Sequence, residues 1–208
     1  MVFSNEQLIG YYDDIVNKYE KIRSEVKKNR ISKVRRGVYS NNAHADRLSI
    51  ANNIVRDSYI SFDYALYFYG LIPERVSVIT SATRNKRRKN VVITEFDKYI
   101  YRDTCSAAFS EGLTCIIDEG NNFVRIASKE KALCDRLSLV PQIRTIKEMY
   151  QLLFDDLRID IDEFSNLNFN EIIRLASLYS KPTLNTLIKY IKRLGKYASS
   201  YWWTIKNV

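Results

Sequence analysis

Five segments of strand length follow one another between residues 76 and 127, and they limit the fold more than any other feature of the chain. Each is rich in β-branched and aromatic residues, which favour a pleated, half-buried surface. Helical patterns stand before and after this stretch, so the sequence predicts an α+β fold. The five segments are Val76–Thr80, Val91–Phe96, Lys98–Asp103, Thr114–Asp118 and Phe123–Ala127.

Two turns are expected inside the β-rich stretch. Ser81–Asn90 carries five cations and is predicted to be the tip of a hairpin between the first two strands. Asp118–Asn122 has the composition of a second hairpin turn.

Helices are expected on both sides of the strands. A helix over Arg47–Arg56 and a short strand ending at Tyr59 and Ile60 precede an aromatic helix that Ser61 caps and Gly70 ends. Its aromatic rings could stack on bases, but a buried core role is favoured because they point in all directions. After the strands, Ser128 is predicted to cap a helix, and further helices are expected at about 145–157, 168–179 and 183–197.

The first 30 residues carry an apolar stripe with spacings of four and three, which is typical of a helix that buries one face. Ser4 is the expected N-cap. The stripe permits one long helix, or a short helix followed by a second one over Tyr19–Arg30. Its members are Leu8, Tyr12, Ile15, Tyr19, Ile22 and Val26.

Positive charge is concentrated in short segments of a chain whose net charge is +9. Residues 18–36 contain nine Lys or Arg and two Glu, and residues 81–90 and 181–208 are also basic. Such clustering is typical of proteins that meet nucleic acid or an acidic partner.

The octapeptide KVRRGVYS, Lys33–Ser40, places a basic turn between two strand-like pieces directly after the basic helix. We interpret it as the wing of a winged helix, with an ordinary surface hairpin as the alternative. Gly37 supplies the backbone freedom that a tight turn requires. Residues 1–42 are therefore predicted to form a small winged-helix-like module, in which few residues precede the wing. Residues 43–208 are predicted to form a mixed α+β domain with a helical C-terminus.

The predicted DNA contacts come from this module, with Arg23, Asn29 and Arg30 as candidates for base edges. The DNA-binding residues are Arg23, Lys27, Arg30, Lys33, Arg35, Arg36 and Tyr39. A possible secondary basic surface consists of Arg84, Lys86, Arg87, Arg88 and Lys89. In the basic tail, Tyr201, Trp202 and Trp203 are either a contact patch or an apolar cap on the last helix.

Two motifs resemble catalytic or metal sites and are discounted. Ser128–Lys131 matches SxxK but lacks the partner motifs of penicillin-binding enzymes, and it is explained as a helix cap. The carboxylates of Asp156, Asp160 and Asp162 resemble a magnesium site but lack an upstream Gly-Ser. We expect no enzyme activity, no metal and no cofactor, and three free, mostly buried cysteines.

The order of these segments resembles the AbiE antitoxin family of type IV toxin–antitoxin systems, which act in abortive infection and phage defence. The resemblance covers about residues 19–140. It rests on KVRRGVYS, on YISFDYALYFYGLIPERVSVIT and on RIASKEKALCDRL. Arg35, Arg36, Gly37 and Tyr39 match the family's wing, while Gly70 and Glu130–Ala132 match scaffold motifs.

The resemblance implies a non-enzymatic antitoxin that counters a nucleotidyltransferase toxin and represses its own promoter by binding inverted repeats. The sequence departs from the family at the N-terminus, where the module is shortened. A cytoplasmic location and no membrane partner are expected, because the N-terminus lacks a signal peptide and no long apolar run is present. The alternative is a protein-interaction module whose basic patches dock on an acidic protein.

Overall fold

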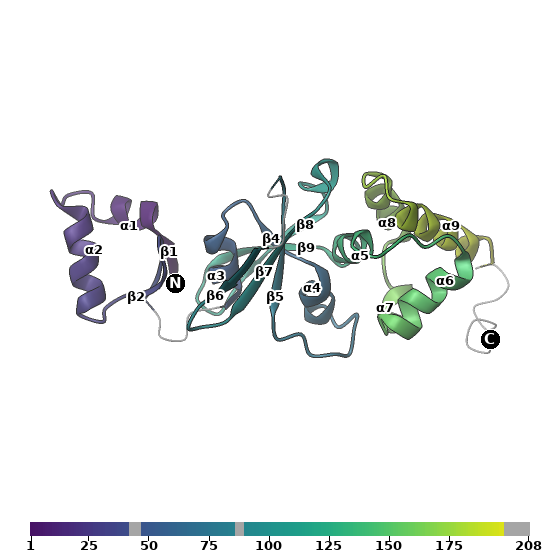
Figure 1. The fold of residues 1–208 in the computed structure, drawn as a ribbon, viewed down its shortest axis with the longest axis horizontal. Coiled ribbons are helices and arrows are strands. Elements are labelled where there is room, and N and C mark those ends of the chain that lie inside the picture. Colours follow the sequence, from purple (N-terminus) through teal and green to yellow (C-terminus); the bar gives the residue numbers. More distant parts are fainter. Residues whose placement is uncertain (42–46, 86–89, 198–208) are drawn as a thin grey trace. The chain divides into compact units, whose positions relative to one another are not determined.

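The computed structural model describes residues 1–41, 47–85 and 90–197 of the 208-residue chain. It has helices and two β-sheets, as expected for an α+β fold (Figure 1). The chain forms two compact units that interleave along the sequence, which differs from a linear division at residue 42. The first contains residues 1–60, 77–103 and 113–126, and the second contains residues 61–76, 104–112 and 127–208.

The first unit opens with a small part that has its own sheet. A strand is followed by two helices and a two-stranded hairpin, and the sheet order is β1-β3-β2 with antiparallel pairs (Figure 1). Ser4 in β1 lies opposite Val38 in β3, so the two ends of this part are joined directly. The elements are β1 (Val2–Ser4), α1 (Asn5–Tyr11), α2 (Lys18–Lys27), β2 (Ser32–Arg35) and β3 (Val38–Ser40).

Capping explains where the two helices begin. The Ser4 hydroxyl accepts from the backbone of Gln7, and the Gln7 side chain accepts from the backbone of Ser4, which forms a capping box. The Asn17 side chain caps α2 by accepting from the backbone N–H of Glu20. The predicted Ser4 cap is therefore confirmed. The apolar stripe forms two helices, which is one of the two arrangements that the sequence permitted.

The core of this part is small and apolar. Leu8, Ile22 and Ile31 are buried together, and Tyr39 is among the half-buried side chains that pack on them. Tyr19, by contrast, is 61% exposed, so its assignment to the buried stripe is wrong. The stripe fails at this residue because α2 starts anew at Lys18 and does not continue the rotation of α1.

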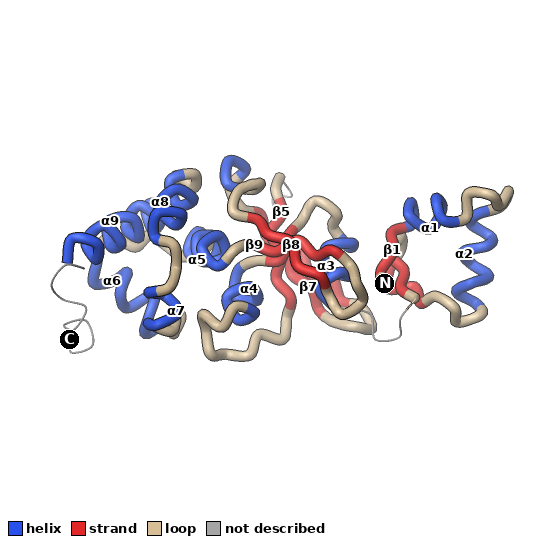
Figure 2. Tube along the Cα trace, turned by 180° about the vertical axis from the view of Figure 1, so that it is seen from behind, coloured by secondary structure: helices blue, strands red, loops and turns tan. Residues whose placement is uncertain are grey.

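The larger sheet of the first unit has the order β6-β7-β5-β4-β9-β8. Figure 2 draws the strands in red. All five predicted strands are present. Lys98–Asp103 and Phe123–Ala127 have the predicted bounds, the other three have shifted ends, and Tyr59–Ile60 form the short strand β4. The other strands are β5 (Ile79–Thr83), β6 (Asn90–Ile93), β7 (Lys98–Asp103), β8 (Leu113–Ile117) and β9 (Phe123–Ala127). The helix α3 (Arg47–Ile54) belongs to the same unit.

The predicted hairpin between the first two strands is wrong. β7 lies between β5 and β6, parallel to β5 and antiparallel to β6. Ser81, placed in the turn by its composition, is a buried residue of β5. The turn at Asp118–Asn122 is confirmed, since the backbone N–H of Asp118 donates to the carbonyl of Asn122 at 3.0 Å.

The second unit is helical. Ser128 caps α5 by accepting from the backbone of Lys131, and Gly70 follows α4 with φ +73°, so both predicted helix ends are confirmed. Its helices are α4 (Phe62–Phe68), α5 (Lys129–Ser138), α6 (Ile146–Tyr150) with the π-helical continuation η2 (Gln151–Asp156), α7 (Ile161–Ser165), α8 (Phe169–Ser177) and α9 (Pro182–Tyr197), together with the short 3-10 helix η1 (Ser106–Ala108). None of the helices in the described ranges combines the length and the apolar character needed to cross a bilayer.

The cysteines are free, as expected, but most of them are not buried. Cys134 in α5 is buried, Cys105 is half-buried and Cys115 is exposed. The prediction of mostly buried thiols is therefore wrong. Cys115 lies on β8, an edge strand of the larger sheet in which no residue is buried.

Candidate functional site

The exposed side of α2 carries the cations that the sequence singled out. Arg23 and Lys27 are exposed, and Ile22 and Glu25 face the interior of the small N-terminal part. The Arg23 guanidinium lies 2.8 Å from the Glu20 carboxylate, one helical turn earlier. This ion pair involves two exposed side chains, at 77% and 61%, and contributes little to stability.

Glu25 is a buried carboxylate that no sequence pattern indicated. Its Oε1 lies 2.9 Å from Lys21 and 3.5 Å from the guanidinium of Arg30. The Lys21 ammonium, helped by Arg30, holds the pKa of the Glu25 carboxyl below its ordinary value. Arg30 is therefore attached to α2, although 64% of its side chain remains exposed.

The hairpin after α2 is built on a two-residue turn. Arg35 pairs with Val38, so Arg36 and Gly37 form the loop, and Gly37 has φ +83°. A side chain at Gly37 would meet no atom within 4 Å, so the need for glycine comes from the backbone angle alone. The carbonyl of Gly37 accepts from the backbone N–H of Asn5 at 2.9 Å, which fastens the turn to the start of α1.

Three cations of this hairpin are exposed. Lys33 and Arg35 lie on β2, and Arg36 lies in the turn. Across residues 1–41, 47–85 and 90–197, none of the three makes a salt bridge to an acidic side chain. Tyr39, which the sequence also assigned to DNA, packs its ring on the core of Leu8 and Ile22, and this is a different role from phosphate contact.

The possible second basic surface is described only at Arg84, which forms an ion pair with Asp57 at 3.3 Å. Lys86, Arg87, Arg88 and Lys89 lie outside the described residues, as do Tyr201, Trp202 and Trp203.

A buried ionic cluster in the second unit was not expected. Lys131 and Asp135 in α5 both have 0% exposure, and their charged groups lie 3.2 Å apart. The Tyr179 hydroxyl lies 2.5 Å from the Lys131 ammonium and 2.7 Å from Asp135. Thr104 and Ser61 donate further hydrogen bonds to the same carboxylate, at 2.6 and 2.7 Å.

This cluster is better explained as a structural joint than as an active site. Burial lowers the pKa of Lys131 and Asp135 opposes that change, which is the pattern of a buried pair. The Asp135 carboxylate joins α5 to the residue before α4, to the segment before η1 and to the segment after α8. Phe62, next to Ser61, has φ +59°, and the burial of its side chain stabilises this left-handed backbone conformation.

The two discounted catalytic motifs are explained by capping and burial. Ser128 caps α5, and the Lys131 of the SxxK motif is committed to Asp135 and Tyr179. Asp160 caps α7 by accepting from the backbone N–H groups of Asp162 and Glu163. Among the residues that the structure describes, no three His, Cys, Asp or Glu side chains gather closely enough to hold a metal ion.

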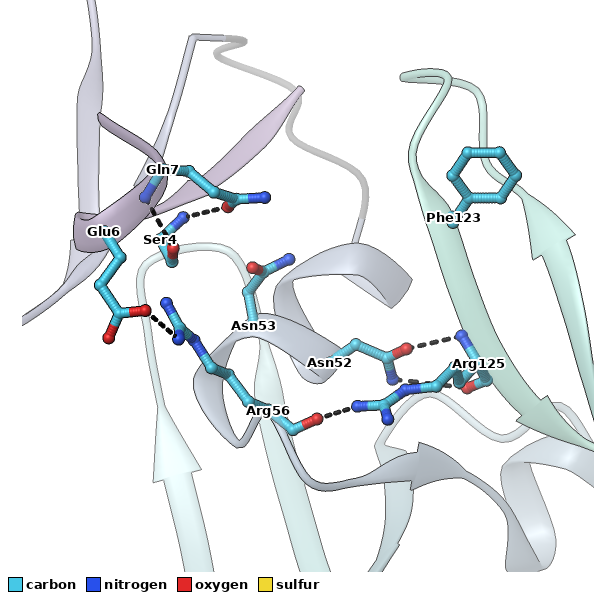
Figure 3. A pocket seen from close by; sticks show the side chains of 8 residues that line it. All are labelled: Ser4, Glu6, Gln7, Asn52, Asn53, Arg56, Phe123 and Arg125. Carbon is cyan, nitrogen blue, oxygen red and sulfur yellow. Dashed lines mark hydrogen bonds and ion pairs between the residues drawn. The ribbon is translucent and has the colours of Figure 1, made fainter. Parts of the chain in front are cut away.

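A pocket of about 550 Å³ lies in the first unit, between α1 and α3 (Figure 3). Its polar walls are bonded to one another: Arg56 to Glu6, Asn52 to the backbone of Arg125, and the Arg125 guanidinium to the carbonyl of Arg56. The charged groups that would attract a ligand are thus already paired. The lining residues are Ser4, Glu6, Gln7, Asn52, Asn53, Arg56, Phe123 and Arg125.

Comparison with known proteins adds information on the fold alone. No protein-family model matches the sequence, and no curated protein matches it. Among solved structures, the RV2827C protein from Mycobacterium tuberculosis is similar, with a TM-score of 0.50 and 13% identity over 92% of this chain and 72% of that one. The chain therefore shares a mixed α+β fold with that protein.

Proposed function

We propose that this chain is a DNA-binding regulator and that residues 1–41 are a shortened winged helix-turn-helix module. The order of the elements carries the proposal: a strand, two helices and a hairpin, with β1 and β2 on either side of β3. Helix-turn-helix proteins place the second helix of the pair in the major groove. In this chain that helix is α2, and the hairpin β2–β3 is the wing.

The charges of the module support a phosphate-binding role. Six exposed cations come from α2, from the segment that directly follows it, and from the hairpin: Arg23, Lys27, Arg30, Lys33, Arg35 and Arg36. Contacts of this kind release counterions from DNA, so the affinity falls steeply as salt rises. They position a protein on the duplex, while base contacts provide the sequence preference.

Fluorescence anisotropy on the inverted repeat upstream of the protein's own gene tests this proposal. The protein is expected to bind that duplex more tightly than a scrambled duplex at the same salt concentration. Equal affinity for the two duplexes would remove promoter recognition from the proposal.

We further propose that the regulator is a non-enzymatic antitoxin of a type IV system, countering a nucleotidyltransferase toxin. The support is the sequence resemblance, whose three motifs fall on the β2–β3 hairpin, on α4 with the segment after it, and on α5. Co-expression tests it: growth of cells that express the toxin encoded beside this gene should recover when this chain is present. Continued growth arrest, with both proteins made, would contradict it.

A protein-interaction module that binds no DNA is the second candidate. It is favoured by exposed cations outside residues 1–41, such as Lys189 and Lys192 on α9. Charge reversal at Arg35 and Arg36 separates the candidates. Loss of toxin neutralisation with unchanged promoter output would favour the interaction module, and loss of repression favours the regulator.

A further inference from the structure

Four side chains of α2 share the side of the helix that lies away from the core. At 3.6 residues per turn, positions 19, 20, 23 and 27 fall within about 100° of arc, opposite the buried Ile22 and Glu25. We call Tyr19, Glu20, Arg23 and Lys27 the α2 outer arc. In the DNA-binding arrangement proposed above, on which this inference rests, the outer arc faces the floor of the major groove.

Glu20 is the unexpected member of the outer arc. A carboxylate repels phosphate, so it weakens binding to every duplex regardless of sequence. Its place in the first turn of α2 favours the helix, and its exposed ion pair with Arg23 adds little to that. The helix dipole accounts for a carboxylate in the first turn of α2, and the bond of this carboxylate to Arg23 is what bears on base recognition.

The geometry of the pair fits a G·C base pair. Glu20 accepts from Nη1 of Arg23 at 2.8 Å, and among the residues described here Nε and Nη2 of Arg23 have no other partner. Nε and Nη2 present two parallel N–H donors, which match the O6 and N7 acceptors of guanine. The carboxylate can also accept a hydrogen bond from the N4 amino group of cytosine. The O4 atom of thymine is itself an acceptor, so it offers the carboxylate no hydrogen bond.

Arg30 and Asn29, the other candidates for base contact, are more constrained than Arg23. Arg30 is drawn to the buried Glu25, and Asn29 adopts φ +54° at the helix end. Lys27 is a flexible point charge rather than a rigid fork, which suits a phosphate better than a base edge.

We infer that Arg23, oriented by Glu20 as a positioning residue, reads a guanine in the major groove and so selects a G·C pair within the target of this chain. Lys27 on the same arc contributes affinity without this preference.

Selection from duplexes with a randomised central segment tests the inference with the full chain. The wild type should enrich a G·C pair at a fixed position, and Arg23→Met should reduce that preference about ten-fold. Glu20→Gln should reduce the preference while binding unselected duplex as tightly as the wild type or more tightly. Lys27→Met, the matched control, should weaken binding to all sequences and keep the preference.

The outcomes separate this inference from the proposed function. Retention of the wild-type preference by Arg23→Met, or enrichment of A·T pairs alone, overturns the inference and leaves DNA binding intact. A parallel loss of general affinity in Glu20→Gln shows a merely structural role and overturns the positioning claim. If the wild type enriches nothing and does not retain duplex DNA, the proposed function fails together with the inference.

Discussion

The Lys131 ammonium and the Asp135 carboxylate lie 3.2 Å apart on α5 with no exposure to solvent. Their surroundings complete the hydrogen bonding, since Tyr179, Thr104 and Ser61 all bond to Asp135. A buried charge is tolerated only when it is paired in this way. The joint therefore ties together segments of the second unit that are distant in sequence.

Removing one charge of this pair should destabilise the protein strongly. Lys131→Met or Asp135→Leu is expected to lower the free energy of unfolding by about 3–5 kcal/mol, because each leaves an unpaired buried charge. The double variant should lose less than the sum of the two, by about 0.5–3 kcal/mol. Urea unfolding followed by circular dichroism measures all three values.

Lys129→Met is the control for this cycle. Lys129 lies on the same helix and pairs with Glu163 at 3.0 Å, but both side chains are 38% exposed. A change within about 0.5 kcal/mol is expected. Strictly additive losses in the double variant would contradict the account of a coupled joint.

Gly37 and Gly10 should respond in opposite directions to alanine. Both have open space where a Cβ would stand, but only Gly37 has positive φ. Gly37→Ala should lower the free energy of unfolding by about 1 kcal/mol because the left-handed backbone resists a Cβ. Gly10→Ala, in α1, should raise it by about 0.5–1 kcal/mol. Thermal unfolding of the two variants beside the wild type checks both signs. Equal shifts in melting temperature would show that the positive φ of Gly37 does not determine the effect of alanine.

The first unit should lose stability in acid through Glu25. Lys21 lowers the pKa of this carboxyl in the folded protein, so folding favours the ionised form. The stabilisation is present above the ordinary pKa of 4.5 and is lost as the pH falls through the lowered folded value. Glu25→Gln should flatten this acid limb in a series of unfolding measurements from pH 6 to about 3, and Lys21→Met should flatten it as well. An acid limb that is unchanged in both variants would show that the pair is not formed.

The sequence was informative where structure is local. Ser4 and Ser128 cap the helices they were expected to cap, and Gly37 forms the predicted turn. Strand order was not predictable, because β7 inserts between β5 and β6 through pairing that no local pattern encodes. The strand β1 was missed since three residues are too few to show a period of two.

The candidate site was predicted in part for the same reason. The cations of the hairpin are visible in the sequence and reach the surface in the structure. The role of Tyr39 was not visible, because a tyrosine on a short strand can face either the core or a ligand. Lys131 and Asp135 have the i, i+4 spacing of an ordinary surface pair, and only the packing of other helices reveals that they are buried.

The salt dependence of duplex binding tests the central claim most directly. In a plot of log affinity against log salt, Arg35→Ala/Arg36→Ala should reduce the slope by up to about 1.8, or about 0.9 for each phosphate that is no longer neutralised. Lys189→Ala/Lys192→Ala, which removes the same charge from α9, should leave the slope unchanged. Equal slopes for the wild type and the Arg35/Arg36 variant, or an equal reduction in the α9 control, would contradict a DNA-binding surface formed by α2 and the β2–β3 hairpin.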